Sequence, residues 1–243
     1  MKKLLIFLPI VLIVTNVIGQ ENLGKYVFPM MPKDKEWKEH KYSERVKILQ
    51  MDEEKLNSLS NVELLGACFD YPFYINFYAF NSLEDGLRNL CSIFRGYPEI
   101  FKRKEMIFDD LISFYKAMGI DKFEDPFTGY NEYYSPLKIL LFEYIISTDE
   151  LLLVITPEQR KRLFNVCREK FFLKNSNLLK FKDNAVFSEI DLQSTAVIIS
   201  KLALLSKEVV DPVFINSINE FLESRKYNSD YYLKLIEFMD LNN

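Results

Sequence analysis

The chain has 243 residues and a formal net charge of −4, with 49% hydrophobic and 27% charged residues. This balance supports a folded core and excludes an intrinsically disordered chain as the default. Basic residues are scattered among acidic ones, which argues against a nucleic-acid-binding surface. The unusual feature is an aromatic content of 15%, with 21 Phe and 14 Tyr.

Residues 1–19 have the layout of a secretory signal peptide. Lys2 and Lys3 precede the apolar run from Leu4 to Ile18, and Gly19 offers a small residue for cleavage. A permanent anchor is the alternative, but a run of about 15 residues is short for a bilayer that requires about 20. We expect cleavage after about Gly19, export to the periplasm or the cell exterior, and no stable membrane span afterwards.

Residues 20–42 resemble an irregular arm, because two prolines and a charge-dense segment interrupt any periodicity. From Ser43 onward, apolar residues recur at helical spacing. Residues 151–155 fit either an extended segment or a short helix. Helices are predicted, in chain order, over residues 43–51 and 52–59, after Ser60, from 81 to a stop at Gly96, around 107–119, and over 135–146, 156–170, 184 or 188 to 206, 211–224 and 229–239.

Helix-start signals support this series. Ser60 and Glu63 form the S-x-x-E capping-box pattern. Proline follows Ser, Thr or Asp at 135–136, 156–157 and 211–212, as is common at the first helical position. Convincing alternating strands are scarce. The predicted fold is therefore all-α, a single domain over residues 43–243, built as an irregular bundle or as a short α-solenoid of stacked helical hairpins.

The segment Phe69–Phe80 is the densest aromatic cluster, with seven aromatic residues in twelve positions. Pro72 ends the preceding helix, so the segment is a structured connection between two helices. Its rings either fill a groove between helices or form a platform for a sugar or a partner side chain. The candidate binding residues are the tyrosines expected to keep a polar tip at the surface and those of a second cluster: Tyr71, Tyr74, Tyr78, Tyr130, Tyr133 and Tyr134.

Catalytic constellations are few. The only histidine, His40, lies in the charged arm, so two-histidine metal sites are impossible and a histidine-based triad is not expected. Ser135 and Lys138 match an S-x-x-K pattern, but a helix cap explains both residues. No cofactor and no metal site is predicted, since only 7 glycines occur and no acidic run forms a calcium loop.

Two carboxylates remain as candidate acids. Glu143 interrupts an otherwise apolar helix and is interpreted as a solvent-facing residue, with a general acid as the alternative. Asp110, beside Asp109, is the second candidate. The three cysteines, Cys68, Cys91 and Cys167, allow one disulfide at most, and the apolar faces around the first two favour small buried side chains.

Residues 59–103 match a sequence pattern found in other proteins. Ser60-Asn-Val-Glu-Leu-Leu-Gly-Ala-Cys-Phe-Asp-Tyr-Pro72 is followed by Ala79-Phe-Asn-Ser-Leu-Glu-Asp-Gly86 and by Gly96-Tyr-Pro-Glu-Ile-Phe-Lys-Arg103. These segments resemble a group of uncharacterised exported proteins of Gram-negative bacteria with the pattern S-x-x-E-L-x-x-x-C-x-x-Y-P, then A-F-N-S-x-x-x-G. The resemblance implies a secreted helical protein and attaches no activity, cofactor or functional residue to it.

The sequence therefore favours a non-catalytic exported binding or interaction protein with an aromatic-rich surface. Its partner would be an envelope protein or a glycan. The alternative is a carboxylate-dependent hydrolase of carbohydrate or peptidoglycan that uses Glu143 or Asp110 as its acid.

Overall fold

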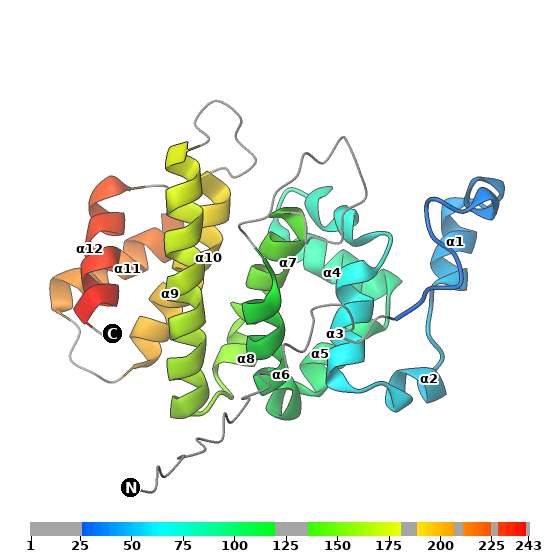
Figure 1. Ribbon diagram of the computed structural model, residues 1–243, viewed down its shortest axis with the longest axis horizontal. Coiled ribbons are helices and arrows are strands. Elements are labelled where there is room, and N and C mark those ends of the chain that lie inside the picture. Colours follow the sequence, from blue (N-terminus) through cyan, green and yellow to red (C-terminus); the bar gives the residue numbers. More distant parts are fainter. Residues whose placement is uncertain (1–25, 120–135, 181–188, 207–210, 225–227, 242–243) are drawn as a thin grey trace, which may run out of the picture.

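The computed structural model describes residues 26–119, 136–180, 189–206, 211–224 and 228–241. Within these ranges it contains twelve α-helices, two 3₁₀-helices and no strand, which confirms the predicted all-α class. The helices pack as an irregular bundle. Along the long axis of the molecule, α1 (Tyr42–Ile48) and α2 (Glu53–Ser58) lie at one end, α3 to α8 in the middle, then α9 and α10, and α11 and α12 at the other end (Figure 1).

The N-terminal part is a group of short elements. The Ser60–Glu63 capping box is present, and Asp52 and Ser82 cap α2 and α4 by accepting hydrogen bonds from backbone N–H groups. The elements are η2 (Lys35–Glu39), α1 (Tyr42–Ile48), α2 (Glu53–Ser58), α3 (Asn61–Asp70), η3 (Tyr74–Tyr78), α4 (Leu83–Ile93) and α5 (Gly96–Lys102).

Longer helices make up the rest. The most extensive helix–helix contact joins α9 and α10, and α10 also packs against α7 and α11. The contact between α10 and α11 agrees with the predicted pairing of residues 184–206 with 211–224. These elements are α6 (Lys104–Ala117), α7 (Pro136–Ile146), α8 (Asp149–Leu152), α9 (Pro157–Lys180), α10 (Glu189–Leu205), α11 (Pro212–Ser224) and α12 (Ser229–Leu241).

Gly96 does not stop a helix, as the sequence predicted, but begins α5. Helix α4 ends at Ile93, and Phe94 is extended. A Cβ on Gly96 would lie 2.5 Å from the Phe94 ring and 2.9 Å from the Cys68 sulfur. The glycine is therefore required by close packing between α5 and α3.

The arm packs onto the core over the part that the structure describes. Phe28 is buried, and its ring centroid lies 5.9 Å from that of Tyr71 and 5.8 Å from that of Phe94. Trp37 of η2 lies against Phe73, with ring centroids 5.2 Å apart. The irregular segment is thus held against the aromatic cluster of residues 69–80.

No described helix combines the length and the apolar character needed to cross a membrane.

Candidate functional site

The aromatic segment 69–80 divides into an inner and an outer set. Helix α3 ends at Asp70, two residues before Pro72, and η3 carries the chain to Tyr78. Phe69, Tyr71, Phe73 and Phe77 are buried. Four of the seven aromatic rings of the segment therefore pack the core, which is the first of its two predicted roles.

Tyr71 belongs to the inner set, so its prediction as a surface-tipped binding residue is wrong. Its ring stacks on Phe94 with centroids 4.3 Å apart and an interplanar angle of 12°. Its hydroxyl donates to the Ile93 carbonyl at 3.1 Å, and burial raises its pKa. Because the polar tip finds a partner inside the protein, no exposure is needed.

Tyr74 and Tyr78 lie in η3 and are partly exposed. The Lys138 ammonium lies 5.4 Å from the Tyr74 ring centroid, and the Tyr78 hydroxyl donates to the Leu137 carbonyl. The structure thus brings both tyrosines to the start of α7. Tyr130, Tyr133 and Tyr134 lie outside the described residues.

Exposed apolar side chains also lie on η3 and beside it. Ile75 is 46% exposed and Phe80 43% exposed, although both are large hydrophobic residues. Tyr42 and Leu137 are also exposed, and they touch η3 through hydrogen bonds that involve Asn76 and Tyr78. We call Tyr42, Tyr74, Ile75, Tyr78, Phe80 and Leu137 the η3 surface.

The η3 surface has a rigid support. Phe77, on the inner side of η3, contacts Tyr78 and Tyr144 with ring centroids 4.9 and 5.4 Å apart. Gly86 of α4 lies so close to η3 that a Cβ would fall 2.1 Å from the Phe77 carbonyl oxygen. The outer side chains are therefore presented by an element that cannot easily shift.

Glu143 is buried, so its interpretation as a solvent-facing residue is wrong. Its side chain and that of Lys174 both have 0% exposure, and the Lys174 Nζ lies 2.7 Å from each carboxylate oxygen. Thr195 donates to Glu143 Oε1 at 2.8 Å and accepts from Lys174 at 2.9 Å. Tyr115 and Ser194 also donate to the carboxylate.

The Glu143 cluster joins four helices: Tyr115 comes from α6, Glu143 from α7, Lys174 from α9, and Ser194 and Thr195 from α10. Burial, followed by the nearby carboxylate, raises the pKa of Tyr115. Five hydrogen bonds to the carboxylate, and one from the Lys174 ammonium to Thr195, compensate the buried charges, as such pairs require. A glycan cannot reach a carboxylate that has no exposed surface, so Glu143 is a structural residue.

Asp110, the second candidate acid, also forms a hydrogen bond within the protein. It lies partly buried in α6 and accepts a hydrogen bond of 2.9 Å from the Asn61 amide at the start of α3. Its neighbour Asp109 is exposed and forms a 2.7 Å ion pair with Arg162.

Over the part of the chain that the structure describes, no three His, Cys, Asp or Glu side chains are grouped to hold a metal ion. All three cysteines are free thiols, and burial raises the pKa of Cys91 to about 11.

The residues that carry the resemblance perform structural tasks. Tyr97 donates to the Cys68 carbonyl at 2.7 Å. That carbonyl would receive an intrahelical bond from residue 72, but Pro72 has no N–H. Arg103 binds Glu99 at 2.9 Å and the carbonyls of Leu59 and Leu56 at 2.7 and 2.9 Å. These positions specify how α3, η3, α4 and α5 pack.

No protein-family model matches the chain, and neither a curated protein nor a solved structure does.

Proposed function

We propose that this is an exported, non-catalytic binding protein that contacts its partner, an envelope protein or a glycan, through the η3 surface. The single observation that carries the proposal is the gathering of exposed large apolar side chains on a rigid support. Isolated exposed hydrophobic residues are normal, whereas a contiguous group on a polar-rimmed surface indicates an interaction site.

The composition of the η3 surface suits this role. Tyrosines combine a broad apolar ring with a hydroxyl group, and they lose little conformational entropy on binding. Tyr78 is already oriented by its hydrogen bond to Leu137, and Tyr74 lies beside Lys138. A surface whose side chains are ordered before binding avoids part of the entropic cost of association.

The buried state of Glu143 supports the non-catalytic part of the proposal. The sequence-based alternative, a carboxylate-dependent hydrolase, requires an acid that touches the substrate. Of its two candidate acids, one has no exposed surface and the other is bound to Asn61.

Site-specific photocrosslinking in the envelope tests the proposal. A p-benzoylphenylalanine residue at position 75, within the η3 surface, should form a discrete adduct with a single partner. The same residue at position 233 is the matched control, because Leu233 is 60% exposed but lies on α12. We expect an adduct from position 75 that is lost in the Tyr74→Ala/Tyr78→Ala variant. Equal adducts from both positions, or none from position 75, would contradict the proposed surface.

A further inference from the structure

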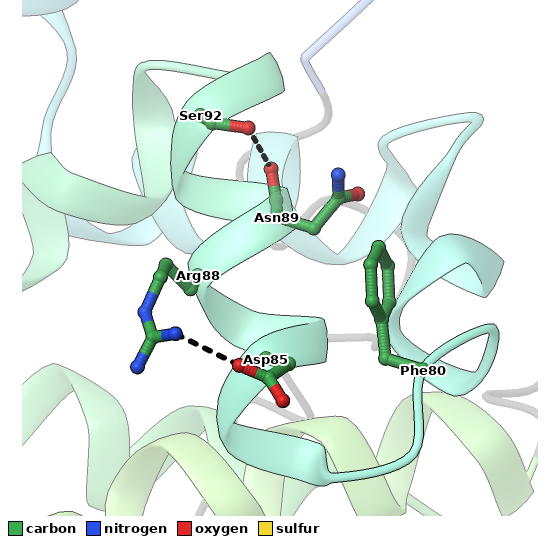
Figure 2. Close-up of a pocket in the computed structure, with 5 residues that line it drawn as sticks. All are labelled: Phe80, Asp85, Arg88, Asn89 and Ser92. Atoms are coloured by element: carbon green, nitrogen blue, oxygen red, sulfur yellow. Dashed lines mark hydrogen bonds and ion pairs between the residues drawn. The ribbon is translucent and has the colours of Figure 1, made fainter.

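A shallow pocket lies at one end of the η3 surface, between Phe80 and helix α4. Its volume is about 360 Å³, and its lining residues are Phe80, Asp85, Arg88, Asn89 and Ser92. Figure 2 shows the Phe80 ring opposite the Asn89 and Asp85 side chains. The volume lies at the lower end of the range for small-molecule sites, which suits one small ring.

One wall of the pocket is a polar stripe. Asp85, Asn89 and Ser92 occupy positions i, i+4 and i+7 of α4, so they share one helical face. The other wall is the exposed ring of Phe80. Close contact of Gly86 with the Phe77 carbonyl fixes α4 against η3, so the spacing between the two walls is set by the fold.

The polar groups of this stripe are oriented before any ligand binds. Asp85 Oδ1 accepts from Arg88 at 2.8 Å, and Oδ2 accepts from the Ser82 hydroxyl at 2.8 Å. Arg88 also binds Glu84 at 2.9 Å. Each Asp85 oxygen keeps a further lone pair, and its charge is balanced by Arg88. Asn89 Oδ1 is enclosed by protein atoms and has no hydrogen-bond partner among the described residues, which leaves the side-chain NH₂ group of Asn89 for a ligand.

These walls match a ligand with one apolar face and a polar edge. A pyranose ring has this form, because its C–H groups can lie on an aromatic ring while neighbouring hydroxyls bond a carboxylate and an amide. An anion would meet Asp85 and Glu84, and a cation would meet Arg88, so a neutral ligand fits best. A purely apolar side chain would leave Asp85 desolvated without new partners.

We infer that this pocket binds one neutral sugar ring of a glycan, with Phe80 stacked on the ring and Asp85 and Asn89 bonded to adjacent hydroxyls. The inference rests on the proposed binding role and narrows its partner to carbohydrate.

Chemical-shift titration of the isotope-labelled protein tests the inference. The probes are the methyl glycosides of glucose, galactose and N-acetylglucosamine, each raised to about 50 mM to cover a Kd on the order of 1 mM for a single ring. At least one probe should give saturable shifts at Phe80, Asp85, Asn89 and Ser92. Phe80→Ala and Asn89→Ala should each weaken binding at least about fivefold, which is about 1 kcal/mol.

Leu233→Ala is the matched control, because Leu233 is an exposed apolar residue on α12 that neither lines the pocket nor belongs to the η3 surface. It should leave the sugar affinity unchanged. The inference is overturned if no probe gives saturable shifts, or if the shifts persist in both pocket variants. A photoadduct at position 75 that survives enzymatic deglycosylation of the envelope, with no sugar bound, would overturn the pocket and leave the η3 surface standing. Sugar binding without any adduct at position 75 would overturn the η3 surface as the partner contact and leave the pocket standing.

Discussion

The η3 surface and the Glu143 cluster place polar and apolar groups in opposite ways. In the cluster, a carboxylate and an ammonium group lie at 0% exposure, with hydrogen bonds from three further side chains. At the η3 surface, the large apolar side chains of Ile75 and Phe80 remain nearly half exposed. The contrast teaches that residue type alone does not decide burial, because internal hydrogen-bond partners allow charges inside while large apolar side chains stay outside.

Alkaline pH is expected to have the largest effect, because it acts on both regions. Burial raises the pKa of Tyr71 and Tyr97 near η3 and of Tyr115 and Tyr231 among the later helices. The unfolded chain loses these protons near pH 10, whereas the folded protein retains them. Stability is therefore fully present below pH 10 and falls by about 1.4 kcal/mol per pH unit per tyrosine above it.

Absorbance at 295 nm and circular dichroism, recorded together between pH 8 and 12, check this expectation (a window of about two units around the ordinary tyrosine pKa). These four tyrosines should ionise only as helical structure is lost. If all 14 tyrosines titrate normally while the dichroism stays native, the described burial is wrong.

Lys174→Met should give the largest loss among single substitutions, about 3–5 kcal/mol in urea unfolding. It leaves the Glu143 carboxylate buried without its cation. The double variant Glu143→Gln/Lys174→Met should recover much of the loss, because glutamine still accepts from Tyr115 and Thr195 without a charge. Arg88→Met is the exposed control, because the side chains of its ion-pair partners Glu84 and Asp85 are 76% and 48% exposed. The loss of stability from Arg88→Met should therefore stay below about 1 kcal/mol. Equal losses of stability from Lys174→Met and Arg88→Met would contradict the distinction between the buried Glu143 cluster and the exposed surface.

Gly86→Ala tests the close contact between α4 and η3 that supports the η3 surface. Alanine normally stabilises a helix interior by about 0.5–1 kcal/mol relative to glycine. Here its Cβ would collide with the Phe77 carbonyl, so we expect a net loss of about 1–3 kcal/mol. Sugar binding should weaken in parallel, because α4 would move away from Phe80. Ser113→Ala, on an exposed position of α6, serves as the stability control and should change stability by less than about 0.5 kcal/mol. An unchanged stability for Gly86→Ala would show that η3 is not held tightly.

The smallest effects distinguish two buried tyrosines within the η3 region. Tyr97→Phe removes the donor to the Cys68 carbonyl, which Pro72 cannot replace, so we expect a loss of about 1–3 kcal/mol. Tyr71→Phe should cost about 0.5 kcal/mol, at the lower end for a hydrogen bond, because the Ile93 carbonyl still accepts from Gln50. Thermal unfolding of the two variants measures the difference. The reverse order would contradict the assigned role of Tyr97.

Local signals in the sequence were sufficient for most helices. The Ser60–Glu63 box and the prolines at 157 and 212 act within one helical turn, so their effect can be read without knowing the partner helices. Helix α5 was missed, because it is short and contains Pro98 near its start. Its Gly96 is required because the backbone packs closely against the Phe94 ring and against the Cys68 sulfur of α3. No rule that uses only neighbouring residues predicts this contact with α3.

The candidate site was only partly predictable. The aromatic segment stands out by composition, and Pro72 indicates that it connects two helices. Which rings face inward depends on Phe94, Tyr97 and Tyr144, contributed by other elements. The pocket beside Phe80 could not be predicted either, since the polar stripe of α4 has the pattern of an ordinary solvated face.

By itself, the sequence determined the all-helical class, most of the helices and the aromatic connection, because each depends on neighbours along the chain. Only the tertiary structure decided that Glu143 is buried, that Tyr71 is inside while Ile75 and Phe80 are outside, and that Phe80 faces α4. Helix α7 is apolar on nearly every side, so no periodicity in its sequence reveals which face meets α9 and α10. The free energy of placing Glu143 inside depends on Lys174 and Thr195, which lie 31 and 52 residues away along the chain.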